Sequence, residues 1–360
     1  MRTLNLGSKA KLMRNLMNTV STLLLVILFI PAFSQVKKQK GIDIPAITDG
    51  LQRYKKDLGN DFVVIVHKDG KEVYRQEFGE MKVMSQEPIG AASQWLTAAL
   101  LMTFVDEGKL ALDDKLGDYL PIYQSYSKGY ITLRQCLAHT TSIEADPPTF
   151  RTVLKKKKFG TLEEEVNSFA KDRNMMGKQG TQFYYGNMGP NIAGRVAEVV
   201  SKRNFDRLMR ERIARPLGLR RTSFAGDGLT GENPSSGALS TSEDYIKFLV
   251  MLQNKGMYNG KQILSEQAVA EMMKMQTGTA KITYTSPLSQ GNSYGLGCWI
   301  QEKDNAGNAA LVNCPGISGT WPWINLAKGY SAIVFTKGEM PDQKRVMFEE
   351  IRTLIEQNIP

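Results

Sequence analysis

The chain has 360 residues, 42% of them hydrophobic, and a formal net charge of +10 at pH 7. This length allows one large domain or two closely joined ones, and the apolar content is sufficient for a real core. The sequence contains no internal repeat, zinc-binding spacing, phosphate-binding loop or RNA-binding signature. These properties exclude a repeat protein and give no basis for a metal site or a nucleic-acid partner.

The first 34 residues are predicted to be an export signal. Four basic residues between positions 2 and 14 precede an apolar run at 23–30, and Ala32-Phe33-Ser34 forms a small-residue cleavage site. The apolar run is eight residues long, whereas a membrane-spanning helix needs roughly 20. We therefore expect cleavage after Ser34 and export to the periplasm or the extracellular space. If the segment is retained, it anchors the protein in a membrane.

Removal of residues 1–34 lowers the net charge from +10 to +6, because the segment holds four basic and no acidic residues. The mature chain is then mildly basic, which favours weak attraction to anionic cell-envelope polymers. The lysines at 155–158 are followed by glutamates at 163–165. We interpret these charges as a solvated helical face and not as a nucleic-acid patch.

The N-terminal half is predicted to begin with a helix and a hairpin. Residues 41–59 carry apolar side chains at helical spacing. Residues 62–67 and 72–78 are predicted strands joined by a Lys68-Asp69-Gly70 turn.

A buried helix follows the hairpin. Residues 95–105 are apolar except at two threonines, and a helix that is apolar on nearly every side belongs in the interior of a domain. We expect about four turns, with Ala91, Ser93 and Gln94 in the first turn and Gly108 after the last.

The remaining elements are predicted to be mostly helical and then mostly extended. Helices are predicted at 132–139, with a Thr132–Gln135 capping box, and at 191–200, 205–213, 240–254 and 342–357. Strands are predicted at 294–301, 309–313, 321–325 and 331–336. Strands at both ends of the chain with helices between them indicate an α/β (α+β) fold, with an antiparallel sheet flanked by helices and an all-helical lobe.

The three cysteines are Cys136, Cys298 and Cys314. An odd number in an exported protein leaves at least one outside any intramolecular disulfide. Cys136 lies in an apolar helical pattern and is expected in the core. Cys298 and Cys314 flank a predicted hairpin; the offset between the strands argues against a disulfide, but their pairing is left open.

The stretch from Pro88 to Pro121 resembles the first motif region of the serine β-lactamase and penicillin-binding protein superfamily, in particular the class C β-lactamase-related hydrolases. Four segments fix the alignment without a gap: Thr97-Ala98, Gly108-Lys109-Leu110, Leu112-Asp113-Asp114 and Tyr119-Leu120-Pro121. This register places Ala91 where the family has its nucleophilic serine and Gln94 where it has its lysine. Both groups are therefore missing.

The resemblance extends over residues 48–355. Its further motifs are Ile131-Thr132-Leu133-Arg134, His139-Thr140-Thr141, Pro216-Leu217-Gly218-Leu219 and Gly237-Ala238-Leu239-Ser240-Thr241. It implies a β-lactamase/transpeptidase-like domain at 35–360 with an active-site groove between two lobes. The α/β lobe is expected at 41–140 and 285–360, and the helical lobe at 141–284. The family's chemistry needs no cofactor and no metal.

The family's second motif is retained, whereas the third is altered. Tyr185-Gly186-Asn187 matches a Tyr-x-Asn motif, so the resemblance implies proton transfer by Tyr185 and a substrate hydrogen bond from Asn187. The third motif falls at Cys314-Pro315-Gly316, with a neutral thiol in place of the family's cation. The resemblance also implies an oxyanion hole formed by the backbone N–H groups of Ala91 and Ile317.

Three interpretations follow from these replacements. The first is an exported pseudoenzyme that binds a peptide-like or ester-like ligand, including peptidoglycan fragments, in the groove. The second is an enzyme of the β-lactamase, esterase or D-Ala-D-Ala peptidase type with a non-standard nucleophile, for which Cys314 is the candidate. The third is a purely structural interaction module.

Overall fold

The computed structural model describes residues 42–145, 159–226, 230–338 and 344–360. The predicted export signal and the lysines at 155–158 lie outside the described residues. The described ranges fall within one compact unit, Gly41–Pro360. None of the described helices is long and apolar enough to cross a membrane. The two-lobe boundaries expected from the sequence remain a prediction.

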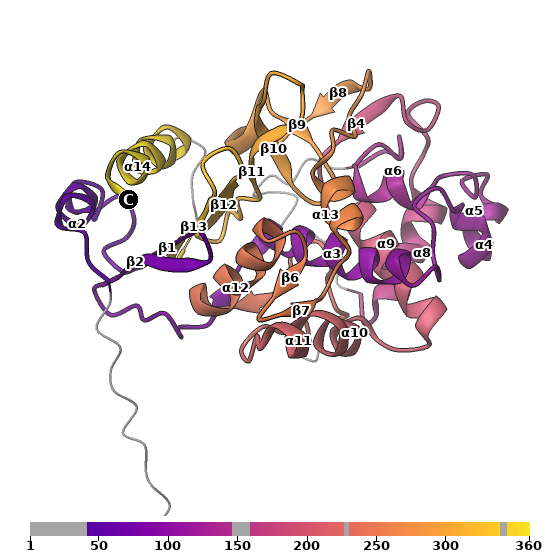
Figure 1. Cartoon of the computed structure of the whole chain (residues 1–360). Helices are drawn as coiled ribbons and strands as arrows, with labels where there is room; N and C mark the ends of the chain where they lie inside the picture. The colour runs from indigo at the N-terminus through magenta and orange to yellow at the C-terminus, as the bar shows by residue number, and fades with distance from the viewer. Residues whose placement is uncertain (1–41, 146–158, 227–229, 339–343) are drawn as a thin grey trace, which may run out of the picture. The chain divides into compact units, whose positions relative to one another are not determined.

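A seven-stranded sheet forms the centre of the fold (Figure 1). All its neighbouring strands are antiparallel. In spatial order the strands are β2 (Lys71–Phe78), β1 (Phe62–Lys68), β13 (Tyr330–Thr336), β12 (Thr320–Asn325), β11 (Ala309–Asn313), β10 (Trp299–Lys303) and β9 (Ser293–Tyr294). The first and last parts of the chain therefore meet at the β1–β13 pair, which confirms the predicted antiparallel sheet.

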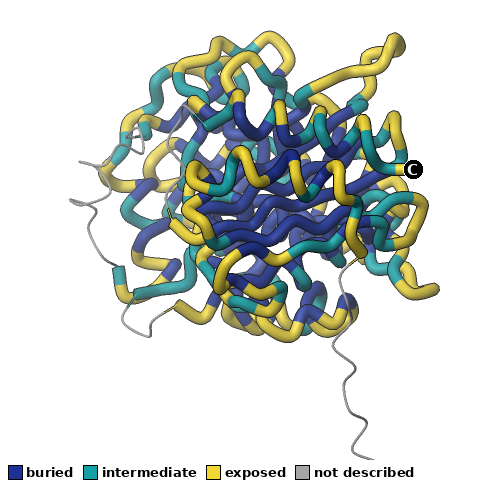
Figure 2. Tube along the Cα trace, turned by 90° about the vertical axis from the view of Figure 1, so that its left-hand side faces the viewer, coloured by how far each residue is buried: buried dark blue, intermediate teal, exposed yellow. Residues whose placement is uncertain are grey.

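The two faces of the sheet are covered by different helices because side chains alternate along each strand. Phe62 and Val64 pack into one core cluster with the terminal helices α2 (Pro45–Gln52) and α14 (Arg345–Asn358). Val63 and Ile65 pack into the second, larger cluster, which contains α3 (Ser93–Asp106) and α12 (Ser242–Gln253). Figure 2 shows the buried strands between these layers.

The predicted central helix is confirmed as α3. All twelve residues from Ser93 to Phe104 are buried, as expected for a helix without a polar face. The other α-helices among the described residues are α4 (Leu116–Tyr119), α5 (Pro121–Ser125), α6 (Leu133–Leu137), α8 (Leu162–Asp172), α9 (Met188–Ser201), α10 (Phe205–Met209), α11 (Arg215–Leu217) and α13 (Glu266–Met273). The Thr132–Gln135 capping box is present at the start of α6.

Two predicted elements have different bounds. The helix expected at 41–59 is α-helical only at Pro45–Gln52, because the next N–H groups of Arg53, Tyr54 and Lys55 bond three residues back and tighten the chain into turns. The strand expected at 294–301 is interrupted between β9 and β10. Gly297 has a φ of +78° there, which extended backbone does not adopt.

Three further two-stranded pairs lie within the described residues, and the sequence analysis predicted none of them. They are β3 (Glu87–Pro88) with β5 (Leu239–Ser240), β4 (Gln182–Tyr184) with β8 (Lys281–Tyr284), and β6 (Met257–Tyr258) with β7 (Lys261–Gln262). The β3–β5 pair directly precedes the start of α3, and the β4–β8 pair leads into Tyr185. Both pairs therefore position segments of the candidate site.

Candidate functional site

The start of α3 is held by contacts from two other segments. A 3-10 turn over Gly90–Ala92 leads into the helix, and the Tyr245 hydroxyl donates a 2.8 Å hydrogen bond to the Ala92 carbonyl. The Ala238 N–H donates to the Ser93 hydroxyl at 3.1 Å. Ser93 is fully buried in this contact, so its hydroxyl fixes the backbone and does not face a ligand.

Two glycines allow the sheet to approach the start of α3 closely. A Cβ atom on Gly316 would lie 2.0 Å from the Ile89 carbonyl oxygen, and one on Gly297 would lie 2.6 Å from the Gln94 carbonyl oxygen. Both distances are shorter than Cβ atoms reach in folded proteins, so a larger residue would push the segments apart. Residues on both sides of the β10–β11 hairpin therefore touch the backbone of the segment that begins α3, at Ile89 before the 3-10 turn and at Gln94 in the first helical turn.

The Ala91 and Ile317 N–H groups lie on segments that run beside each other. A Cβ atom on Gly90 would lie 3.6 Å from the Ile317 nitrogen, so the turn after Gly316 passes directly along the residue before Ala91. Within the described ranges neither N–H finds a hydrogen-bond acceptor. Backbone N–H groups seldom remain unpaired. Water or a ligand oxygen is therefore the expected partner of this pair of donors.

The Gln94 side chain joins three separate segments at the position of the missing lysine. Its Oε1 accepts hydrogen bonds of 2.9 Å from the Tyr294 hydroxyl and 2.9 Å from His139 Nε2. Its Nε2 lies 3.4 Å from the Gly186 carbonyl oxygen. Gln94 is only 3% exposed. The amide is therefore committed to internal contacts, and it has no basic lone pair that could take a proton from a nucleophile.

Sequence reasoning did not assign His139 or Tyr294 to the site. They stand 45 and 200 residues from Gln94, and no local pattern indicates that folding brings them together. Burial lowers the pKa of His139 to about 3, so the imidazole is neutral at physiological pH. Burial also raises the pKa of Tyr294 well above its ordinary value. The Gln94 network consequently carries no charge.

Tyr185 belongs to an aromatic cluster behind Ala91. This cluster consists of Phe183, Tyr185, Tyr294 and Trp299, and Ala91 packs against it. The rings of Tyr185 and Trp299 have centroids 4.8 Å apart. Burial is the main cause that raises the pKa of Tyr185 well above its ordinary value. The phenol is therefore held protonated, which disfavours the proton-accepting role that the resemblance implied for it.

Cys314, which the resemblance assigns to the third motif, lies beside Ala91. Its thiol donates to the Ala91 carbonyl at 3.3 Å and is fully buried. Burial raises the pKa of Cys314 to about 12, so the thiolate, which is the nucleophilic form, is nearly absent at neutral pH. Cys136, Cys298 and Cys314 are all free thiols.

Asn187 is turned towards the helical segment. Its Nδ2 lies 3.4 Å from the Glu165 carboxylate, and Asn191 Nδ2 donates to the same carboxylate at 2.9 Å. Glu165 is buried and Asn187 half-buried. One N–H of the Asn187 amide is thus directed to Glu165, and its second N–H and its carbonyl oxygen remain for a ligand.

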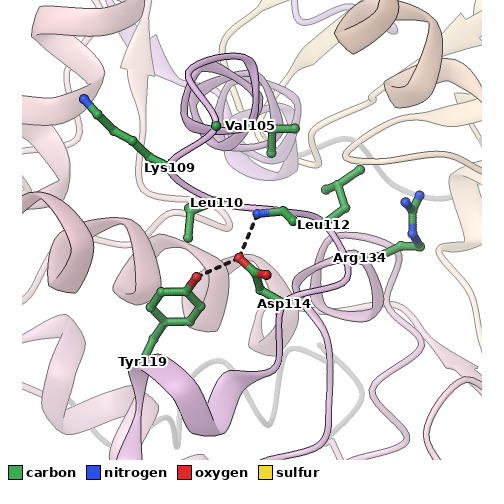
Figure 3. A pocket seen from close by; sticks show the side chains of 9 residues that line it. Val105, Lys109, Leu110, Leu112, Asp114, Tyr119 and Arg134 are labelled. Atoms are coloured by element: carbon green, nitrogen blue, oxygen red, sulfur yellow. Dashed lines mark hydrogen bonds between the residues drawn. The ribbon is translucent and has the colours of Figure 1, made fainter.

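The described residues hold no group of three or more histidine, cysteine or acidic side chains that could bind a metal ion. A surface pocket of about 590 Å³ lies after the C-terminal end of α3 (Figure 3). There the Asp114 carboxylate accepts from the Ala111 N–H at 2.7 Å and from the Tyr119 hydroxyl at 2.6 Å. These bonds stabilise the loop and are separate from the Ala91 region.

The Beta-lactamase family model matches residues 59–353. A crystal structure of a "putative beta-lactamase" from Bacteroides dorei DSM 17855 superposes with a TM-score of 0.76, at 27% identity, over 86% of this chain and 98% of that one. An octameric penicillin-binding protein homologue from Pyrococcus abyssi superposes with a TM-score of 0.70, at 21% identity, over 88% of this chain and 79% of that one.

A curated relative supports the same family. The Escherichia coli K12 protein named "Putative D-alanyl-D-alanine carboxypeptidase" is 26% identical over 191 residues, which are 47% of this chain and 44% of that protein. The match to protein flp of Staphylococcus aureus covers 34% of that protein. The chain thus matches less than half the length of these relatives.

Proposed function

Since this chain belongs to the Beta-lactamase family, we propose that it is an exported pseudoenzyme that binds a peptide-like or ester-like ligand beside Ala91 and does not perform serine acyl transfer. Acyl transfer in this fold requires a nucleophile, a base and an oxyanion hole. Ala91 has no nucleophilic atom, and the Gln94 amide is occupied by Tyr294 and His139. Only the backbone donors remain of the three requirements.

The observation that carries the binding proposal is the pair of N–H groups at Ala91 and Ile317. Neither has an acceptor among the described residues, and replacement of a serine by alanine leaves its backbone donor in place. The first turn of α3 adds the partial positive charge of a helix N-terminus. A carbonyl oxygen of a ligand can therefore still be bound where the reaction itself can no longer occur.

The alternative is an enzyme that uses a different nucleophile. Cys314 is the candidate closest to Ala91, but its thiol is fully buried and hydrogen-bonded to the Ala91 carbonyl. A reaction at this sulfur requires both exposure and deprotonation, and burial opposes each of them. The geometry therefore favours the binding protein.

The test is a titration of the protein with D-Ala-D-Ala peptides, peptidoglycan fragments and boronic acids, followed by NMR. We expect dissociation constants in the micromolar to millimolar range, about −8 to −4 kcal/mol. Because no cation pairs with the ligand, binding should depend only weakly on salt. Boronic acids should bind no better than matched carboxylates, because their adduct requires the missing serine hydroxyl.

Two variants at Ile317 make the test specific. Ile317→Pro deletes one backbone donor and should abolish binding, whereas the matched control Ile317→Ala keeps the N–H and should retain it. If no ligand binds the wild-type protein and Ile317→Pro behaves like the wild type, the site is not functional. The interpretation as a structural module would then replace the one proposed here.

A further inference from the structure

We infer that the ligand is an uncharged ester or amide with apolar groups beside its carbonyl, and not a carboxylate. This inference rests on the proposed function, because it concerns the same pair of backbone donors. Three features of the site carry it: the neutrality of its polar side chains, the pairing of the neighbouring Lys337 with Glu87, and the mainly apolar character of its exposed rim.

The polar side chains around the two donors are neutral. Gln94 accepts from His139 and Tyr294, and Cys314 donates its proton to the Ala91 carbonyl. Burial keeps His139 unprotonated and Cys314 protonated at neutral pH. A carboxylate that enters this site therefore finds no opposite side-chain charge.

Within the described ranges, no lysine or arginine forms a hydrogen bond or ion pair with the residues of the site. These residues are Ala91, Gln94, Tyr185, Tyr294, Cys314 and Ile317. Lys337, at the end of β13, follows Thr336, whose N–H bonds to Gly319 in the turn that carries Ile317. Its ammonium lies 4.0 Å from the Glu87 carboxylate, and its side chain is 72% exposed. Lys337 is thus largely surrounded by solvent and has the Glu87 carboxylate as its ion-pair partner.

The exposed rim beside the donors is mainly apolar, and its polar member is the neutral hydroxyl of the half-buried Ser318, which lies against Gly90. Ile317 is 51% exposed, and Leu239 is 37% exposed. Leu239 pairs with Pro88 in the β3–β5 ladder, which places it next to the turn that carries Gly90 and Ala91. The Ala91 methyl itself packs against the aromatic cluster. Apolar groups of a ligand can therefore remove these side chains from water when its carbonyl is bound.

A ligand carbonyl and a ligand carboxylate would bind to the same two N–H donors, but they lose different amounts of hydration free energy on binding. The helix N-terminus attracts negative charge. A carboxylate must, however, give up most of its hydration and receives no cation in return, whereas a neutral carbonyl loses far less on desolvation. Since the polar side chains around the donors are neutral, desolvation decides the preference in favour of the neutral compound.

The experiment compares N-acetyl-phenylalanine with its methyl ester and its primary amide at pH 7, by NMR titration. The ester and the amide should bind at least about tenfold more tightly than the free acid. Ile317→Lys adds a cation at a position that is half exposed and should reduce or reverse this difference. The control Ile317→Gln has similar length and no charge, and it should keep the wild-type preference.

The outcomes separate the two proposals. If the free acid binds the wild-type protein as tightly as the ester, the inference about ligand class is wrong, while the proposed binding function stands. If Ile317→Lys and Ile317→Gln give the same preference, the apolar, uncharged rim does not set specificity and the inference is also wrong. If none of the three compounds nor any D-Ala-D-Ala peptide binds, the proposed function itself fails.

Discussion

Gln94 gives the position of the missing lysine a different chemical role. A lysine ammonium is a donor only, whereas the Gln94 carbonyl accepts two hydrogen bonds, from Tyr294 and from His139. A change of residue 94 therefore also requires its partners to exchange donor and acceptor roles. At the scale of single residues, the site has therefore lost its lysine and gained a hydrogen-bonded amide with its own partners.

The protonation of His139 tests this description directly. Burial lowers its pKa to about 3, so the imidazole should remain neutral throughout the range above that value. The folded state binds this proton less readily than the unfolded chain, so the free energy of unfolding is highest above the unfolded pKa of about 6.5 and decreases as the pH falls below it. ¹⁵N NMR of the imidazole should show one unchanged neutral tautomer between pH 7 and pH 5. A titration midpoint near 6.5 in the folded protein would contradict the buried network.

Reconstruction of the family's catalytic pair is a second test at this scale. Ala91→Ser with Gln94→Lys should fold, but with reduced stability, because a buried ammonium loses hydration and the acceptor of Tyr294 and His139 is removed. We expect a loss of roughly 1–3 kcal/mol, measured by denaturant unfolding. Activity towards a chromogenic cephalosporin should be weak at most and should rise on addition of Cys314→His. A fully stable and highly active double variant would show that the Gln94 network contributes little.

At the scale of elements, backbone contact between the sheet and α3 defines the site. The β10–β11 hairpin is bounded by Cys298 and Cys314, and a glycine next to or near each end approaches the helix start. The sequence predicted the hairpin and the helix separately. Their contact depends on Gly297 and Gly316, whose need for close approach is not visible in a local pattern.

Gly316→Ala should displace the turn that carries Ile317. The added Cβ would lie 2.0 Å from the Ile89 carbonyl oxygen, and because this atom belongs to the backbone it cannot move away as a flexible side chain could. We expect a loss of about 1–3 kcal/mol in the unfolding free energy and weaker ligand binding. Gly186→Ala is the matched control, since a Cβ there meets no atom within 4 Å. Equal stability of the two variants would rule out the proposed close contact.

The difference between local sequence patterns and tertiary contacts explains which elements could be predicted from the sequence. The buried helix, the capping box at Thr132 and the strands β1, β2 and β11 follow from short-range periodicity and turn residues, and the structure confirms them. The break between β9 and β10 and the short pairs β3–β5 and β4–β8 arise from tertiary contacts. Periodicity carries no information about such contacts.

At the scale of the whole molecule, the order of motifs along the chain was sufficient to predict the family, because several weak segments occur in one sequence with compatible spacing. The alignment also placed Ala91, Gln94, Cys314 and Ile317 near one another, and these residues do converge on the start of α3. His139 and Tyr294 could not be assigned, since their role exists only after residues far apart in sequence have come together.

The predicted export signal leads to a further whole-molecule prediction. When the full-length chain is expressed in a bacterium with a general secretion pathway, the mature protein should begin at Gln35 and be found outside the cytoplasm. N-terminal sequencing of the purified protein provides the measurement. A protein that retains residues 1–34 and fractionates with membranes would instead support the anchor.

The most direct test of the account is intact-mass spectrometry after incubation with penicillins and activated esters. Without a nucleophile at Ala91 or a base at Gln94, acyl transfer should fall by several orders of magnitude, on the scale of serine hydrolases that lack the same groups. We predict that the mass of the protein remains unchanged. A stable covalent adduct would contradict this result, and an adduct at Cys314 would identify the protein as an enzyme with a thiol nucleophile.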